Sequence, residues 1–250
     1  MHLVYLCNNV DFLRLMLAKL PQPFNMMTVV VNERNKFMLP EMGVLLKASK
    51  QKTWVLRTDG EFIERYSYLQ YVREHPLAIK FILPFCIPQP FLYMDDDCVI
   101  CSPVPTGLYY SVCVLDRPKV SEHHLRLYDR VCEIFGDTTF QTYQNQRTEA
   151  GIWSINLDEN AYYIYFKQWS ETAWFYELDG NKFRTLGQTF LSAVFRTRPE
   201  MRKLLPTEYC ALPFKFDSTA RRLPKKRCFI HYVATSHKMK YCQWLMEVLP

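Results

Sequence analysis

Asp95, Asp96 and Asp97 are consecutive and stand between two apolar runs, at residues 91–94 and 98–101. Aromatic and branched side chains fill these runs and prolines lie on both sides, which is typical of short strands inside a sheet. Carboxylates this close together repel one another unless a cation shares their oxygens. The triple therefore predicts a site for Mg²⁺ or Mn²⁺ at the end of a buried strand. A solvated acidic turn is the alternative, but the triple lacks the Gly, Asn or Ser that usually accompanies one.

The length and composition of the chain are those of a protein with a full core. Its 250 residues are 49% hydrophobic, which is enough for one large domain. No apolar run reaches the roughly 20 uninterrupted residues that a bilayer-spanning helix needs, and the N-terminus lacks the features of a secretory signal. The nine cysteines form an odd set without a framework spacing, which favours a reducing compartment. We therefore expect a cytoplasmic protein that does not bind a membrane.

The first hundred residues alternate between short apolar runs and helical stretches, as a parallel sheet with crossover helices requires. We predict strands at residues 2–7, 27–31, 53–57 and 91–94, and helices at residues 11–20, 40–49 and 60–74. Residues 1–101 thus form a nucleotide-binding half of an α/β fold, with ligands expected at the carboxyl ends of the strands.

The remaining residues, 102–250, are rich in aromatic clusters and show few clear alternations. We predict strands at residues 107–115 and 151–155, and helices at residues 121–135, 161–170 and 189–196. No internal repeat and no convincing linker separates the two halves. The chain is therefore expected to form a single domain.

The segment from Phe91 to Ile100 resembles the strand and Asp-x-Asp motif of GT-A glycosyltransferases. That resemblance implies a Rossmann-like, mostly parallel central sheet with flanking helices. The segment 229–232 is similar to the strand whose His binds the metal in the glycogenin-like branch of the family. The chain departs from that branch after His231, because Ala234 replaces a Gly and Lys238 falls one position late. The similarity covers the whole chain but is specific only around the acidic triple and, more weakly, around His231.

The resemblance implies a site for a nucleotide sugar and a divalent cation, Mn²⁺ or Mg²⁺. Its implied metal ligands are Asp95, Asp97 and His231. The residues that it implies around the nucleotide sugar are Asn8, Asp59, Asp95, Asp96, Gly151, Gln188 and Lys238. A cation is needed because carboxylates and a diphosphate repel each other, and it also neutralises charge on the leaving diphosphate. The implied reaction is the transfer of a hexose from a UDP-sugar, with UDP-glucose as the expected donor, to an acceptor hydroxyl.

An inverting enzyme of this kind needs a carboxylate within hydrogen-bond reach of the acceptor hydroxyl. Asp179, in the polar turn at residues 177–180, is our choice for this catalytic base over Glu177, Glu149 and Asp217. Two alternatives stay open, since Asp179 can be an ordinary turn residue before a glycine and a retaining enzyme requires no such base.

The charge of the chain bears on the acceptor. The formal net charge is +6, and five cations stand within seven residues: Arg221, Arg222, Lys225, Lys226 and Arg227. Such clusters supply sequence-independent affinity for a nucleic-acid backbone. We therefore expect a phage-type enzyme that modifies hydroxymethylated pyrimidines in double-stranded DNA. The alternative is a viral or bacterial transferase that acts on a glycan.

The sequence allows three other interpretations. A non-catalytic nucleic-acid-binding module would explain the basic cluster but not the acidic triple, which repels phosphates unless a metal is bound. A redox pair of Cys98 and Cys101 conflicts with strand alternation, which places the two thiols on opposite faces. A zinc site can be written from four C-terminal residues, although their spacings do not match the usual paired ligands: Cys228, His231, His237 and Cys242.

Overall fold

The structure is a computed structural model that describes residues 1–21, 24–58, 80–104, 111–117, 147–155, 167, 202–205, 210–211, 229–231, 239–240, 243–244 and 247. The helices whose bounds are described include α1 (Val10–Lys19), the 3-10 helix η1 (Glu33–Met38), α2 (Leu39–Ala48) and α5 (Leu83–Cys86). The strands of the larger sheet are β1 (His2–Leu6), β2 (Met26–Asn32), β3 (Thr53–Thr58), β4 (Phe91–Met94), β6 (Ser111–Arg117), β7 (Arg147–Ile155) and β8 (Arg202–Leu205). Those of the smaller sheet are β5 (Cys98–Ile100), β9 (Cys210–Ala211) and β10 (Phe229–His231).

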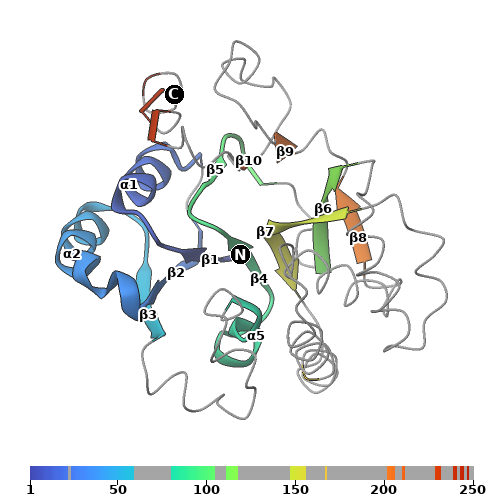
Figure 1. Ribbon diagram of the computed structural model, residues 1–250, viewed down its shortest axis with the longest axis horizontal. Coiled ribbons are helices and arrows are strands. Elements are labelled where there is room, and N and C mark those ends of the chain that lie inside the picture. The colour runs from blue at the N-terminus through green and yellow to red at the C-terminus, as the bar shows by residue number, and fades with distance from the viewer. Residues whose placement is uncertain are drawn as a thin grey trace, which may run out of the picture.

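The described strands form a seven-stranded sheet in the order β3-β2-β1-β4-β7-β6-β8 and a three-stranded sheet in the order β5-β10-β9 (Figure 1). Strands β3, β2, β1 and β4 run parallel to one another, whereas β7 runs antiparallel to both β4 and β6. The fold is therefore α/β with a mostly parallel central sheet, as the sequence predicted.

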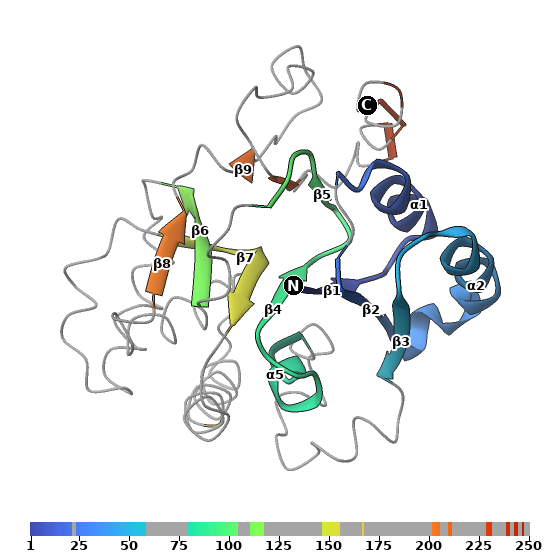
Figure 2. The ribbon, with the colours of Figure 1, turned by 180° about the vertical axis from the view of Figure 1, so that it is seen from behind.

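Helices α1 and α2 pack on one face of the parallel strands. Leu3 and Tyr5 of β1 and Val29 of β2 share a core cluster with Leu13 of α1 and Met42 of α2. Figures 1 and 2 show both helices beside β1 to β3, with β7, β6 and β8 on the far side of β4. Because these parallel strands are covered, their sequences are nearly continuous apolar runs rather than alternating ones. That is why the strands of the first half were recognisable from the sequence.

Trp153 forms a second packing centre where β4 meets β7. It lies opposite Tyr93 in the strand pairing, with its ring stacked on the Tyr93 ring at a centroid distance of 4.8 Å. Phe91 and Phe81 also contact it, at 5.8 and 6.3 Å. Trp153 is only 1% exposed, so this aromatic group ties β4 to the second half of the chain.

Several boundaries differ from the predicted ones. Helix α1 begins at Val10 and is capped by Asn9, because the amide oxygen of Asn9 accepts the Asp11 N–H. The second predicted helix, at residues 40–49, is α2 at Leu39–Ala48, and an unpredicted 3-10 helix, η1, precedes it. Strand β7 begins at Arg147, four residues before its predicted start. The predicted helices at 60–74, 121–135 and 189–196 lie outside the described residues, as does 161–170 apart from Lys167. No helix in the described part is long and apolar enough to cross a bilayer.

Candidate functional site

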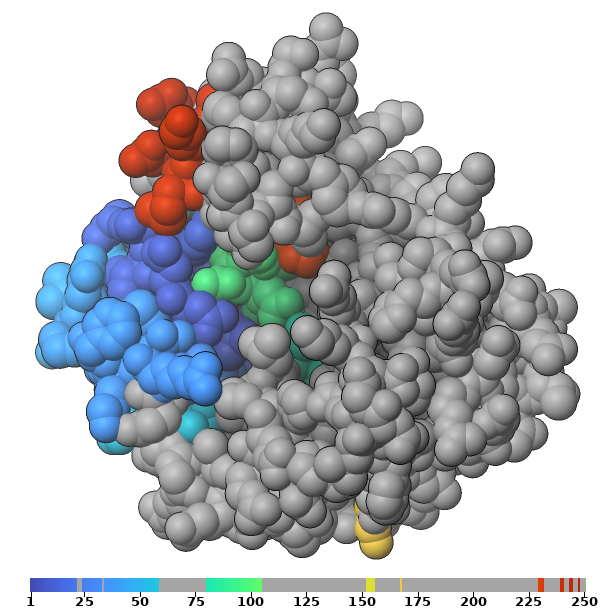
Figure 3. Space-filling model, viewed as in Figure 1, coloured from blue at the N-terminus to red at the C-terminus, as the bar shows by residue number. Residues whose placement is uncertain are grey.

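The acidic triple forms the connection between the two sheets. Strand β4 of the larger sheet ends at Met94 and β5 of the smaller one begins at Cys98. The Cys98 N–H donates to the Asp95 carbonyl oxygen at 3.1 Å, which closes a four-residue turn. Figure 3 shows green β5 atoms and orange-red β10 atoms together near the centre of one face, beside the blue N-terminal half. The three carboxylates therefore lie at the edge of the sheet where the parallel strands β1 and β4 end, as predicted.

A buried tyrosine from β1 holds the middle of this turn. The Tyr5 hydroxyl donates to the Asp96 carbonyl oxygen at 2.9 Å, and Tyr5 is fully buried. Burial raises the pKa of Tyr5 well above its usual value, and the negative charge of Asp96 adds to the effect. The hydroxyl therefore keeps its proton and remains a donor, so β1 fixes the position of the turn.

Both carboxylate oxygens of Asp95 are engaged by the protein. Lys80 Nζ lies 3.1 Å from Oδ2, and the Tyr93 hydroxyl donates to Oδ1 at 2.5 Å. Lys80 also sits over the rings of Phe81 and Tyr93, at 5.5 and 5.6 Å from their centroids, a geometry that favours a cation. Burial raises the pKa of Tyr93 well above its usual value, with the Asp95 charge as the next cause. The ammonium group of Lys80 thus neutralises part of the negative charge of the acidic triple. The sequence alone had indicated only a metal ion for this purpose.

Asp97 faces His231 of strand β10. Its Oδ1 lies 3.2 Å from His231 Nε2, and the two side chains are only 10% and 9% exposed. His231 of β10 pairs directly with Cys98 of β5 in the antiparallel register, so their side chains project to the same side of the small sheet. One ligand atom from each of Asp97, Cys98 and His231 lies within 4.8 Å of the other two. Among the described residues this is the group with the composition of a metal site.

Asn8 follows β1 and belongs to a small amide network. Its Oδ1 accepts from Asn32 Nδ2 at 3.1 Å and from Asn35 Nδ2 at 2.9 Å. The orientation of Asn32 is set by its own Oδ1, which accepts the Asn35 backbone N–H and caps η1. Since a carbonyl oxygen has two lone pairs, the Asn8 oxygen is saturated and its Nδ2 is the group that Asn8 can offer to a ligand.

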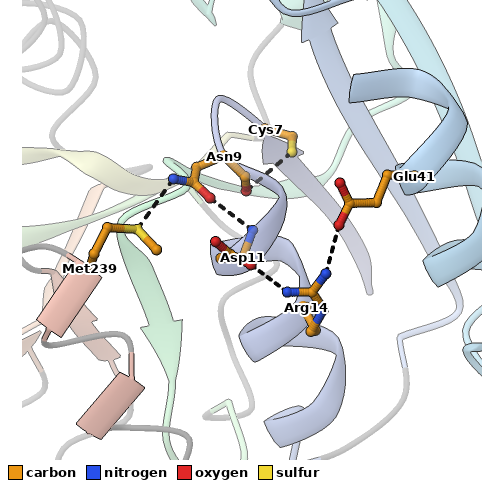
Figure 4. A network of polar contacts seen from close by, with 6 residues as sticks. All are labelled: Cys7, Asn9, Asp11, Arg14, Glu41 and Met239. Atoms are coloured by element: carbon orange, nitrogen blue, oxygen red, sulfur yellow. Dashed lines mark hydrogen bonds and ion pairs between the residues drawn. The ribbon is translucent and has the colours of Figure 1, made fainter. Parts of the chain in front are cut away.

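The first turn of α1 lies beside the C-terminal part of the chain (Figure 4). Asn9 Nδ2 donates to Met239 Sδ at 3.4 Å. Arg14 joins Asp11 in the same helix to Glu41 of α2, with a 2.6 Å contact to Glu41. These charged side chains are about half exposed, from 43% to 57%, and exposed ion pairs contribute little to stability. The contact of Asn9 with Met239 links the end of β1 to a residue more than two hundred positions away.

The structure describes some of the predicted site residues and leaves others outside its described part. Asn8, the three aspartates and His231 lie around the ends of β1, β4 and β10. Gly151 of β7 stands one position beyond the Met94–Ile152 pair, at the same edge of the sheet. The following predicted residues lie outside the described part of the chain: Asp59, Asp179, Gln188, Arg221, Arg222, Lys225, Lys226, Arg227 and Lys238.

Sequence reasoning assigned no role to Tyr5, Lys80 or Cys98. The continuous apolar run of β1 predicts that Tyr5 is buried, but not that its hydroxyl reaches the acidic turn. Lys80 precedes β4 in the sequence, but this position alone does not predict its contact with Asp95. The role of Cys98 depends on its pairing with His231, which no local pattern indicates.

The solved structures that are similar to this chain include two glycosyltransferases. Mouse xyloside xylosyltransferase 1 in its apo form is 12% identical with a TM-score of 0.58, and 93% of this chain and 97% of that one are covered. Galactosyltransferase LgtC in complex with donor and acceptor sugar analogues is 13% identical with a TM-score of 0.55, and 100% and 97% are covered. At these identities the likeness concerns the fold, and the GT-A fold is confirmed. No protein-family model and no curated protein matches the chain.

Proposed function

We propose that this protein is a glycosyltransferase that uses a divalent cation to move a hexose from a nucleotide sugar to an acceptor hydroxyl. The observation that carries the proposal is the buried pair of Asp97 and His231, whose Oδ1 and Nε2 atoms lie 3.2 Å apart. The pair lies beside the edge of the sheet at which open α/β folds bind ligands. In a GT-A fold, this placement supports a donor site at the same edge.

The oxygen of Asp97 and the ring nitrogen of His231 are suitable ligand atoms for a divalent cation. Carboxylate oxygens suit Mg²⁺ and Mn²⁺, whereas an imidazole nitrogen is a transition-metal ligand, so the pair favours Mn²⁺ over Mg²⁺. The cation, when bound, supplies positive charge that stabilises the leaving diphosphate. We propose Asp97 and His231 as its ligands, with the carboxylate of Asp95 as a third ligand.

The remaining residues of the site have separate roles in this proposal. Lys80 offsets the charge of Asp95, so that fewer like charges face an incoming diphosphate. Tyr5 and Tyr93 hold the turn from two sides. Asn8 offers its Nδ2 donors to an acceptor atom of the nucleoside, because its oxygen is already used. Asp59, Asp96, Gly151, Gln188 and Lys238 remain proposed contacts of the nucleotide sugar, and Asp179 remains the proposed base.

UDP-glucose is the proposed donor, and its slow hydrolysis without an acceptor is the first test. The protein is incubated with UDP-glucose in parallel with other UDP- and GDP-sugars, with added Mn²⁺ and after chelation of metals. We expect that UDP-glucose binds, and that UDP is released from it, only when the metal is present. A non-catalytic nucleic-acid-binding module would release no nucleotide from any donor, and that result would refute the proposed activity.

His231→Ala is expected to weaken Mn²⁺ affinity by roughly 10- to 100-fold, the range typical of groups that support a bound metal. The measurement is donor hydrolysis as a function of Mn²⁺ concentration, and excess Mn²⁺ should restore part of the lost activity. The control is His2→Ala, which removes a hydrogen bond to Thr28 at the opposite end of β1 and should leave the Mn²⁺ dependence unchanged. If no Mn²⁺ concentration restores activity, His231 is not a metal ligand.

The proposed acceptor is duplex DNA with hydroxymethylated pyrimidines, and the proposal rests on the five cations between Arg221 and Arg227. A target base must leave the stack before transfer, which costs a few kcal/mol that contacts to the DNA backbone offset. Neutralising three of the five cations should weaken DNA binding on all sequences. It should also make the salt dependence shallower, because the negative slope of log affinity against log salt shrinks in magnitude by about 0.9 per lost contact.

Donor hydrolysis is the control in this experiment and should not change. The comparison is transfer to modified DNA against transfer to simple glycosides. An unchanged salt dependence, or transfer to glycosides alone, would favour the glycan-acceptor alternative.

A further inference from the structure

Asn8, Asn32 and Asn35 form a network of side-chain hydrogen bonds at the ligand edge of the sheet. Asn8 follows β1, Asn32 is the last residue of β2, and Asn35 lies in η1. Strands β1 and β2 are parallel neighbours, and the Cys7 N–H donates to the Val30 carbonyl oxygen at 2.9 Å, which holds the end of β1 against β2. The network therefore lies where the carboxyl ends of two parallel strands meet, the place at which open α/β sheets bind ligands.

The direction of each hydrogen bond in this network follows from one group that can only donate. The backbone N–H of Asn35 donates to Asn32 Oδ1 at 3.1 Å. Because the oxygen of Asn32 is turned to this N–H, its Nδ2 is the amide atom that faces Asn8, at 3.1 Å. An Nδ2 group donates, so the Asn8 atom opposite it is Oδ1. Asn35 Nδ2, 2.9 Å from the same oxygen, is a second donor, and the Nδ2 of Asn8 faces away from both neighbours.

A reversed Asn8 amide would break both of these contacts. Rotation of the amide by a half turn would place Asn8 Nδ2 against two other Nδ2 groups, and donors that face each other form no hydrogen bond. A hydrogen bond within a protein typically favours one state roughly 2- to 12-fold, so two of them favour the observed orientation roughly 5- to 150-fold. Asn8 is therefore presented to a ligand as a donor, and Asn32 and Asn35 fix that orientation.

A donor at this position distinguishes between pyrimidine bases of the same shape. Uracil carries a carbonyl oxygen, O4, where cytosine carries the N4 amino group. The Nδ2 of Asn8 can donate to the carbonyl oxygen, whereas the amino group would leave two donors facing each other. A site built to form a hydrogen bond discriminates strongly against a ligand that cannot form it. The amide network thus favours a base that presents a carbonyl oxygen to Asn8.

We propose that Asn32 and Asn35 are positioning residues that hold Asn8 as a hydrogen-bond donor to the base of the nucleotide sugar. The site then takes a base with a carbonyl oxygen at this point, as in uracil, and rejects an amino group, as in cytosine. The inference rests on the proposed function for the presence of a nucleotide at this edge. It adds to that function two residues that select the base through Asn8 rather than by contact with the nucleotide.

The test compares the binding of UDP and CDP by the full chain, measured by titration calorimetry with Mn²⁺. The two ligands carry the same diphosphate, so the ratio of their affinities reports the base alone, even in variants of altered charge. We expect UDP to bind roughly 5- to 100-fold more tightly than CDP. Asn8→Ala removes the donor and should bring the ratio close to one.

The double variant Asn32→Asp, Asn35→Asp tests the positioning role. Both Nδ2 donors become carboxylate oxygens, which favour the reversed Asn8 amide with its own oxygen toward the ligand. The UDP preference should then be lost or inverted, while the carboxylate at position 32 still accepts the backbone N–H that begins η1. Asn25→Asp is the control and should keep the preference, because this exposed residue precedes β2 at the opposite end of the strand.

Two results would overturn the inference and leave the metal-dependent donor site intact. The first is a CDP affinity equal to or above that of UDP in the intact protein. The second is an unchanged UDP preference in the double variant with a native circular dichroism spectrum. If the double variant does not fold, Asn35→Asp alone, which leaves the Asn32 cap of η1 in place, takes its place and should reduce the preference. Absence of binding by any nucleoside diphosphate would instead overturn the proposed function itself.

Discussion

Asp97→Asn is expected to abolish metal-dependent binding of the nucleotide sugar while leaving the fold intact. The substitution removes a charged ligand, and even supporting groups around a metal are typically worth roughly 10- to 100-fold in affinity, so the loss should exceed about 100-fold. The Asn side chain keeps the shape of the Asp while removing a buried negative charge that the other two aspartates repel. The melting temperature should therefore stay the same or rise. Titration calorimetry with donor and metal is the measurement.

The matched control for this variant is Asp11→Asn in α1. Asp11 is also an aspartate in an ion pair, but its side chain is 48% exposed and its partner is Arg14. We expect no change in metal-dependent binding for Asp11→Asn. Undiminished binding by Asp97→Asn, with a native circular dichroism spectrum, would remove the metal site from the proposal.

Trp153→Ala is expected to cause the largest loss of stability among single core substitutions, about 3–5 kcal/mol. Trp153 is the largest fully buried side chain among the described residues, at 1% exposure, and its ring contacts three aromatic rings from other segments. Replacing it leaves a cavity that these rings can fill only in part. Urea unfolding followed by far-ultraviolet circular dichroism gives the change in the free energy of unfolding.

Trp54→Ala is the control for this effect. Trp54 is on β3 and is 54% exposed, so its removal should cost little. Equal losses for the two variants would contradict the aromatic packing described for β4 and β7. Because Trp153 stacks on Tyr93, and the Tyr93 hydroxyl holds Asp95, a folded Trp153→Phe variant should lose donor affinity along with stability.

The contact between Lys80 and Asp95 shows where the sequence argument was incomplete. Three adjacent carboxylates do require positive charge, and that conclusion follows from the sequence because the residues are covalent neighbours. The source of the charge does not follow from it. Lys80 is fifteen residues away along the chain, and the structure brings its ammonium to 3.1 Å from Asp95, which divides the triple into a protein-neutralised carboxylate and the Asp97 group.

The orientation of Asn8 is a second case. Its place at the end of the first strand was predictable, because the preceding run of apolar residues is a buried parallel strand. Which of its amide atoms faces a ligand depends on Asn32 and Asn35, which reach it from the end of β2 and from η1. The 3-10 helix was not predicted, so the saturation of the Asn8 oxygen could not be anticipated.

The sequence by itself determined the α/β class, the strands of the parallel half and the acidic turn at the end of β4. Those features depend on apolar runs and on neighbouring residues, which act over a few positions of the chain. The tertiary structure alone decided which atoms meet Asp97, because Cys98 and His231 are brought together by strand pairing across more than a hundred residues. Such a register depends on the packing of both sheets as a whole, and no local pattern of residues encodes it.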